Sequence, residues 1–259
     1  MQTTSNNIAK KDFDWSTTFN LSHYKTKIVN VGLYDANGNP MDDIGSRWFI
    51  GQPISVNYDY RFIGIWQITD PSNPNGQQDP NYRYSIPGYM KYHDKDGVND
   101  ITPADKEIIG SAIPKVTMGM TNTFRYKNFD LSFFLRGTIG NDILNATRMA
   151  YAQSGFLPGT NALDDPLTYT LSETPRFSNY YLEKGSFMRL DNLTLGYKIK
   201  ALNGIRVYFT AQNLFVITKY KGLDPEVPMD SGDGLTPGVE PREFYPKVST
   251  FPVGLNLNF

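Results

Sequence analysis

Strict alternation of apolar and polar residues is the feature that most restricts how this chain can fold. In residues 251–259 every odd position is apolar, and the positions between hold proline, glycine or asparagine; the apolar five are Phe251, Val253, Leu255, Leu257 and Phe259. Successive side chains of a β-strand point to opposite faces, so this pattern predicts a strand with one apolar face. Phe13–Leu21 and Val116–Lys127 alternate in the same way. The sequence therefore predicts an all-β protein.

Two of the predicted connections are short. Only Lys127 and Asn128 precede the next alternating run, 129–136, as in a tight hairpin. Asn203 and Gly204 supply a second turn, between predicted strands at 193–200 and 205–212. Antiparallel neighbours are therefore expected.

Other connections are long. Residues 137–186 and 218–250 are rich in Pro, Gly, Asn and Asp, and one or two more strands are expected within 48–67. Short turns that alternate with long loops are typical of an antiparallel transmembrane β-barrel, with short periplasmic turns and long extracellular loops. A secreted or surface β-sandwich that binds carbohydrate is the alternative, because it has the same periodicity.

Composition narrows the class of protein. Aromatic residues make up 14% of the chain although its mean hydropathy is −0.43, and no apolar run approaches the roughly 18 residues of a transmembrane helix. A transmembrane barrel reconciles these values, because only alternate residues face lipid. The 25 basic residues nearly balance the 26 acidic ones, so no nucleic-acid partner is expected.

The chain offers little for catalysis. It has no cysteine, and its two histidines, His23 and His93, lie far apart without a serine nucleophile signature or metal-ligand spacing. A calcium-dependent polysaccharide-degrading enzyme would need an acid/base pair, which the sequence does not indicate. We expect no enzyme.

One acidic segment has the spacing of a calcium loop. Residues 94–105 place acids at the first, third, seventh and twelfth positions: Asp94, Asp96, Asp100 and Asp105. Hard cations need several oxygens that converge from a tight turn, so calcium is a candidate ligand. Val98, at the fifth position, offers no side-chain oxygen, and Asp105 stands where a longer Glu is usual. A solvated acidic turn is the alternative.

Aromatic residues in the long loops have two interpretations. Tyr151, Phe156, Tyr180 and Tyr181 carry rings that can stack on sugars, or they can simply pack the loop. Substrate-binding residues are therefore not assigned.

Several phrases occur in an order that resembles one family. Residues 213–226, Asn-Leu-Phe-Val-Ile-Thr-Lys-Tyr-Lys-Gly-Leu-Asp-Pro-Glu, resemble the penultimate-strand signature of SusC/RagA-like TonB-linked outer-membrane proteins. Residues 187–197 resemble the strand before it, and earlier phrases follow the same order. These are Trp15–Leu21, Gly51–Ile54, Pro87–Gly88, Lys91–Tyr92, the acidic stretch from Asp94, Ile109–Gly110 and Phe124–Leu131. The resemblance covers nearly the whole chain.

This resemblance implies the carboxyl-terminal portion of a large barrel, commonly of about twenty-two strands, that imports oligosaccharides or peptides across the bacterial outer membrane. It implies a SusD-like lipoprotein as an outer lid and the TonB system, which acts through an amino-terminal plug. Neither plug nor TonB-contacting segment is visible here. Met1–Asp12 lacks the pattern of a secretory signal, so the chain is expected to be a fragment.

The alternating run at 251–259 takes on a further role in this interpretation. Its apolar side chains would face membrane lipid, with Phe259 in an interfacial aromatic girdle. We expect the run to serve as the signal that barrel-assembly machinery recognises by strand pairing.

Overall fold

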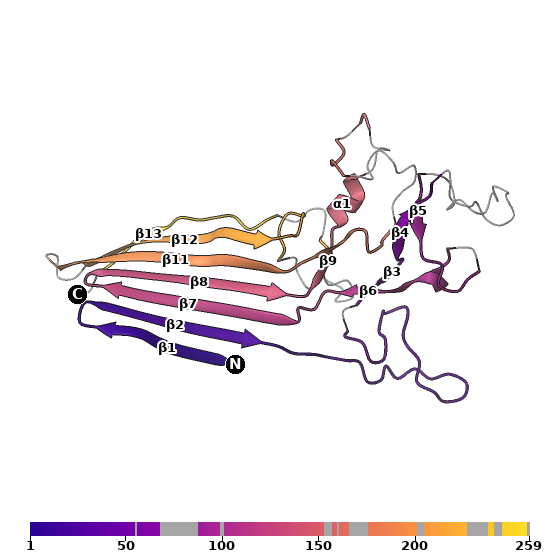
Figure 1. The fold of residues 1–259 in the computed structure, drawn as a ribbon, viewed down its shortest axis with the longest axis horizontal. Coiled ribbons are helices and arrows are strands. Elements are labelled where there is room, and N and C mark those ends of the chain that lie inside the picture. The colour runs from indigo at the N-terminus through magenta and orange to yellow at the C-terminus, as the bar shows by residue number, and fades with distance from the viewer. Residues whose placement is uncertain are drawn as a thin grey trace.

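A seven-stranded antiparallel sheet dominates the computed structural model, in the order β1-β2-β7-β8-β11-β12-β13 (Figure 1). The structure describes residues 1–54, 56–67, 88–98, 101–152, 157–159, 161–165, 176–200, 205–226, 238–240 and 245–257. The strands are β1 Gln2–Lys10, β2 Phe13–Ser22, β7 Val116–Tyr126, β8 Phe129–Ile139, β11 Phe187–Ile199, β12 Ile205–Thr218 and β13 Val253–Asn256. The predicted all-β antiparallel architecture is confirmed.

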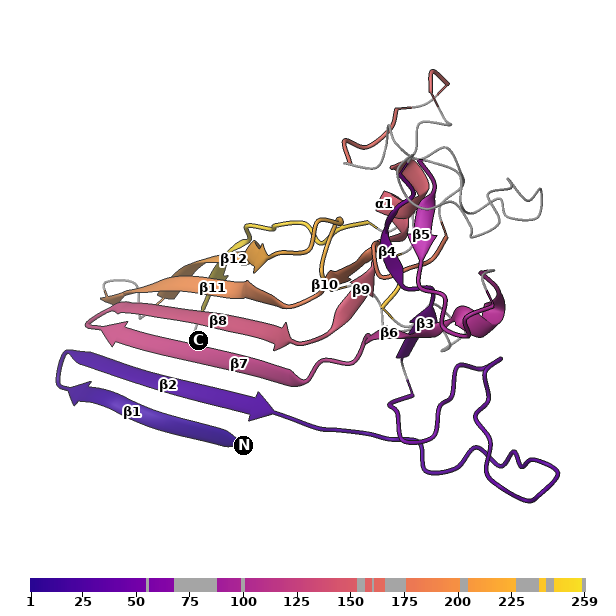
Figure 2. The ribbon, with the colours of Figure 1, turned by 45° about the vertical axis from the view of Figure 1, so that its right-hand side comes forward.

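The connections divide the sheet into two ends. The β1–β2 and β7–β8 connections, the end of β11 and the start of β12 lie at one end, here called the turn end, whereas the described parts of the long connections extend from the opposite loop end (Figures 1 and 2). Small elements fill the loop end: β3 Val56–Asp59, β4 Phe62–Ile65, β5 Met90–Tyr92, the short 3₁₀-helix η1 Pro103–Asp105, β6 Glu107–Ser111, β9 Asp142–Leu144, α1 Ala146–Tyr151 and β10 Leu182–Lys184. They form three two-stranded sheets, β3–β6, β4–β5 and β9–β10. Nothing in the described part of the chain is a helix long and apolar enough to cross a membrane.

Register gives the sheet two chemically different faces. Directly paired residues share a face, and Phe13, Tyr126, Phe129, Tyr197, Val207 and Leu255 are paired in turn across six strands. A second such row is Trp15, Phe124, Leu131, Leu195, Phe209 and Val253. We call this the apolar face. The row between them, which includes Asp14, Arg125 and Asp130, belongs to the opposite, polar face.

A bulge explains why the apolar residues of β11 change from even to odd positions along the strand. Met188 and Leu190 occupy even positions, whereas Leu193 and Leu195 occupy odd ones. The register shifts between Leu190 and Asn192 against both neighbouring strands. Against β8 the extra residue is Asp191 of β11, whereas against β12 the extra residue lies on β12, between Gln212 and Phe215. On β12 the facing Asn213 has a positive φ of 50°. This irregularity accounts for the blurred alternation of 214–217.

Gly196 allows a contact across a strand. Arg206 on β12 reaches over β11 to Asp130 on β8, with Nε 2.9 Å from Oδ1. A Cβ at residue 196 would lie 2.5 Å from both Arg206 Nη2 and Asp130 Oδ1. Glycine is therefore required for this ion pair between non-adjacent strands.

The structure differs from the predicted elements in three places. β1 was not predicted. The strands expected in 48–67 exist as β3 and β4, but they belong to small sheets at the loop end. The last strand begins later than the alternation predicts, at Val253, because Pro252 has no N–H for the ladder. The carbonyl of Pro252 still accepts a hydrogen bond from Thr210 N, and Thr250 forms a bridge with Gln212.

Candidate binding face and acidic turn

Two arginines dominate the polar face near the loop end. Arg136 on β8 and Arg189 on β11 are direct cross-strand partners. Like charges in this position repel, and Arg189 is only 2% exposed, so the pair needs buried carboxylates nearby.

The segment after β12 supplies two of these carboxylates. Glu226 accepts a hydrogen bond from Arg136 Nη2 at 3.0 Å, and its Oε2 lies 2.8 Å from Arg189 Nε. Asp224 accepts from Arg189 Nη2 at 2.7 Å. Together with Asp191, 2.8 Å from Arg136, these carboxylates stabilise the two guanidinium groups.

Lys247 completes this network, which we call the arginine network. Its Nζ lies 2.9 Å from Glu226 Oε2, so it ties the far end of the 218–250 connection to the same carboxylate. Three cations and three anions therefore meet on the polar face. Asp224 and Glu226 lie within the family-like phrase 213–226, but no role was predicted for them, because nothing in the sequence pairs them with arginines on other strands.

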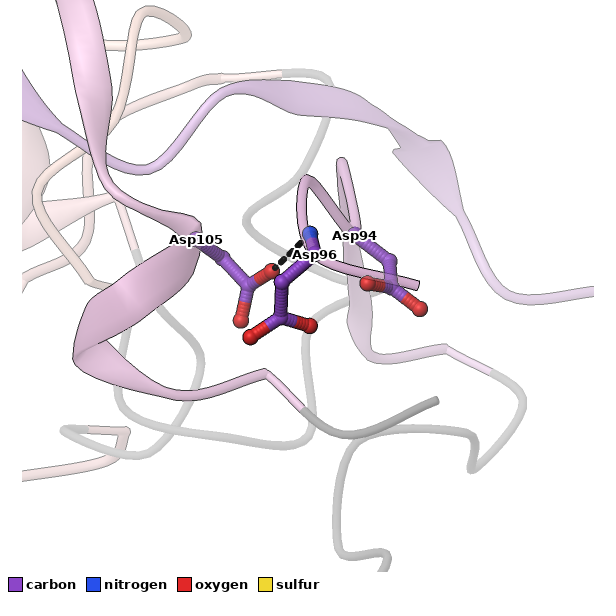
Figure 3. Close-up of side chains that lie close together, drawn as sticks. All are labelled: Asp94, Asp96 and Asp105. Atoms are coloured by element: carbon purple, nitrogen blue, oxygen red, sulfur yellow. Dashed lines mark hydrogen bonds between the residues drawn. The ribbon is translucent and has the colours of Figure 1, made fainter. Parts of the chain in front are cut away.

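The structure brings together three of the four predicted cation ligands. One carboxylate oxygen each of Asp94, Asp96 and Asp105 lies within 4.8 Å of the others (Figure 3). Asp100 lies outside the described residues. The carboxylates that are close in the sequence of this turn are therefore also close together in the structure.

Asp105 organises this turn from within. Its Oδ1 accepts from the backbone N–H of Lys95 at 2.8 Å and of Asp96 at 3.4 Å, and its Oδ2 accepts from Thr102 N at 2.7 Å. Burial raises the pKa of the Asp105 carboxyl, but hydrogen bonds from Thr102, Lys95 and Asp96 outweigh it, and the pKa lies below its ordinary value. These bonds, with another from Thr102 Oγ1, use the lone pairs that a metal would need.

Asp94 and Asp96 are less committed to the turn. Asp94 Oδ1 accepts from Gly97 N at 2.7 Å, and Asp96 Oδ1 accepts from Val98 N at 3.0 Å. These contacts are those of an acidic turn held by its own backbone.

The loop aromatics differ in exposure. Tyr181 is fully buried with Met90 and Tyr60 in the core of the loop end, so its ring has no free face for a ligand. Tyr180 packs edge-on against Tyr181 and Phe62. Tyr151 is exposed, and Phe156 lies outside the described residues.

The two histidines lie in separate surroundings. His23 Nδ1 lies 2.6 Å from the carbonyl oxygen of Lys115, whereas His93 Nδ1 lies 3.1 Å from Glu107 Oε1. The structure does not bring them into one site.

The alternating residues at the last strand are exposed. Val253 is 73% and Leu255 63% accessible, and Phe251 and Leu257 are also exposed, while Phe259 lies outside the described residues. Phe251 stacks on Phe209 of the neighbouring strand at 6.2 Å between centroids. Their side chains thus extend the apolar face.

Known proteins resemble the chain along nearly its whole length. No family model matches it. It is 34% identical to TonB-dependent receptor P3 of Formosa agariphila over 98% of the chain, and 31% identical to TonB-dependent receptor SusC of Bacteroides thetaiotaomicron over 97%. The chain spans only 28% and 25% of these relatives' lengths. Its fold matches the RagAB peptide transporter with a TM-score of 0.70 at 22% identity, over 98% of this chain and 28% of the other.

Proposed function

Because this chain belongs to the SusC-like TonB-dependent receptors, we propose that it forms barrel wall and outer loops of a nutrient importer in the bacterial outer membrane. The apolar face contacts lipid in this proposal. The polar face, with the arginine network, lines the barrel interior, and the loop end faces the outside.

The exposed apolar face is the observation that carries this proposal. Monomeric soluble proteins rarely leave an apolar surface of this extent in water. Contact with lipid removes the free-energy cost of exposing this apolar surface to water. The paired aromatic residues at the turn end cross four strands, where an interfacial girdle is expected: Phe13, Tyr126, Phe129 and Tyr197.

The alternative β-sandwich finds less support. A sandwich buries the apolar face of one sheet against a second sheet about 10 Å away. Within the described ranges the other sheets are two-stranded, and residues such as Leu195 and Leu255 remain exposed.

Cargo and partners follow from the same assignment. The complete protein imports oligosaccharides or peptides without a chemical step, a SusD-like lipoprotein covers its loop end, and TonB acts through a plug. Barrel-assembly machinery recognises the alternating run 251–259, which contains β13. The relatives are named as TonB-dependent receptors, and RagAB is described as a peptide transporter, which supports this class of function.

Thiol labelling tests the topology. The chain has no cysteine, so a single Val98→Cys or Lys127→Cys substitution in the complete receptor reports one position within it. A membrane-impermeant maleimide should label Cys at the loop-end position 98 on intact cells. It should label the turn-end position 127 only after the outer membrane is permeabilised.

The unaltered receptor gives the background for any thiols elsewhere. Equal labelling of both positions on intact cells, or recovery of the receptor without detergent, would contradict the proposal. Uptake of labelled oligosaccharides and peptides by cells that carry each variant is measured in a separate experiment.

A further inference from the structure

A cavity at the loop end lies between α1 and the segments that follow β12. It has a volume of about 290 Å³, and its lining includes Asn145, Thr147, Asp164, Lys221, Gly222 and Glu240. None of these residues belongs to the acidic turn or the arginine network. The cavity is therefore a separate candidate site.

Glu240 lines this cavity with a half-satisfied carboxylate. The residue is 0% exposed, and its Oε2 accepts from Tyr220 Oη at 2.7 Å and from Leu223 N at 2.9 Å. Its Oε1 has no hydrogen-bond partner in the part of the chain that the structure describes. A buried carboxylate oxygen without a donor is unfavourable, so this atom is suited to receive one from a ligand.

A second buried oxygen lacks a partner in the same lining. Thr147 Oγ1, on α1, is shielded from solvent and makes no hydrogen bond to the described residues. Two unsatisfied oxygens in one cavity indicate a ligand that donates hydrogen bonds.

The backbone holds Glu240 in place. Its N–H donates to Leu144 O at 2.9 Å. A Cβ at residue 222 would clash with Glu240 Oε2 and with Tyr220 Oη, so Gly222 is needed for this close approach. Because these contacts fix Oε2, Oε1 is the acceptor of this carboxylate that has no partner among the described residues.

The charge of the residues around the cavity indicates whether the hydrogen-bond donor of the ligand is a cation or a neutral group. Among the described residues, the lining carries three carboxylates, of Asp164, Asp165 and Glu240, against the two cations of Arg148 and Lys221. A fourth carboxylate, of Glu183, contacts Arg148 and the backbone N–H of Lys221. Arg148 is already held by Asp165 at 2.5 Å and Glu183 at 3.3 Å. This excess of negative charge favours a cation over a neutral hydroxyl group. A calcium ion would need six or more oxygens around it, and the two buried oxygens without a partner among the described residues, Glu240 Oε1 and Thr147 Oγ1, are fewer than that.

We propose that this cavity binds a primary ammonium group of the cargo, with Glu240 as the charged acceptor and Thr147 as a second acceptor. The inference rests on the proposed import function, since it assigns the cavity to cargo. It deepens that function by favouring peptides or amino-bearing molecules over neutral glycans.

Calorimetric titration of the complete receptor tests the inference. The probes are triglycine with a free amino terminus, N-acetyl-triglycine, maltotriose and calcium chloride. Triglycine should bind at least about tenfold more tightly than its acetylated form, since a hydrogen bond to a charged group contributes about that factor. Glu240→Gln should remove this preference, and the distant matched change Glu107→Gln should retain it.

Thr147→Val serves as the second variant, because Glu240→Gln can disturb folding through Tyr220. It should weaken triglycine binding without changing the binding of the acetylated peptide. Equal binding of both peptides, binding of maltotriose or calcium alone, or no binding of any probe would overturn the inference. Normal uptake by cells in any of these cases would leave the import function standing, whereas loss of all uptake would count against the function itself.

Discussion

At the scale of single residues, Asp105 illustrates how burial and hydrogen bonding compete. Its lowered pKa means that folding favours the ionised carboxylate. Its stabilisation is complete above the ordinary pKa of 3.8, and it is lost as the pH falls from there through the folded pKa. We expect the amides of Lys95, Asp96 and Thr102 in the complete receptor to lose protection below about pH 4, measured as exchange relative to the intrinsic rate at each pH.

Asp105→Asn provides the comparison. An amide keeps the shape but turns one acceptor into a donor that faces backbone N–H groups, at a cost of about 1–3 kcal/mol. The variant should exchange rapidly at neutral pH and show no further acid transition. Identical pH profiles for the two proteins would remove the assigned role of Asp105.

Calcium binding by the acidic turn remains a prediction with its own test. If Asp94, Asp96 and Asp105 ligate calcium, the ion should raise the melting temperature of the complete receptor, and Asp94→Ala should abolish that increase. In chelator the two proteins should melt together. Equal melting of the unaltered receptor with and without calcium would support the acidic turn held by its own hydrogen bonds.

At the scale of elements, Glu226 joins β8, β11 and the 218–250 connection. Glu226→Ala leaves Arg136 and Arg189 facing each other with reduced compensation, and loss of one partner of a buried pair costs about 3–5 kcal/mol. We expect a lower unfolding temperature of the complete receptor and faster proteolysis within the 218–250 connection. Asp14→Ala, on the same polar face but outside the arginine network, is the control. Equal effects of the two changes would contradict the network's role.

The two faces of β13 give a sharper test of lipid contact. Leu255 lies on the apolar face, and its neighbour Asn256 lies on the polar face. A charge on the lipid face of a barrel costs up to a few kcal/mol, whereas one facing the interior is tolerated. Leu255→Asp should leave synthesis and export of the complete receptor intact but prevent its insertion. Asn256→Asp should insert normally, as measured by membrane fractionation and surface proteolysis.

Alternation predicted those strands whose two faces differ in the polarity of their residues. β2, β7, β8, β11 and β12 all carry this contrast. β1 does not, because Gln2–Asn7 is uniformly polar, and only the backbone ladder with β2 makes it a strand. α1 and the strands β5, β6, β9 and β10 of the loop end were also missed, since the core of this end is assembled from residues distant in sequence, such as Tyr60 and Tyr181.

The same limit explains what was missed in the candidate sites. The acidic turn is local, so its spacing was visible in the sequence. The arginine network joins residues on two strands and two later segments, and the cavity around Glu240 joins α1 to residues near 220 and 240. Such sites depend on register and loop packing, which a single sequence does not specify.

At the scale of the whole molecule, the seven-stranded sheet has an apolar and a polar face, and its two edge strands, β1 and β13, each have one side that is unpaired among the described residues. In the described structure β1 pairs only with β2, and β13 only with β12. Each edge therefore presents unpaired backbone groups, which find no hydrogen-bond partners in hydrocarbon. A closed barrel removes both edges, so the stability of this sheet in a membrane depends on further strands.

We therefore expect the isolated chain to form no stable pore. Purified alone and added to planar bilayers, it should give no discrete conductance steps, and its open edges should pair between copies and produce aggregates in detergent. The complete receptor, refolded in parallel, should remain monodisperse and heat-modifiable on gels. Reproducible unitary conductance from the isolated chain would show that these seven strands close without partners, and the assignment of the chain as part of a larger barrel wall would then be wrong.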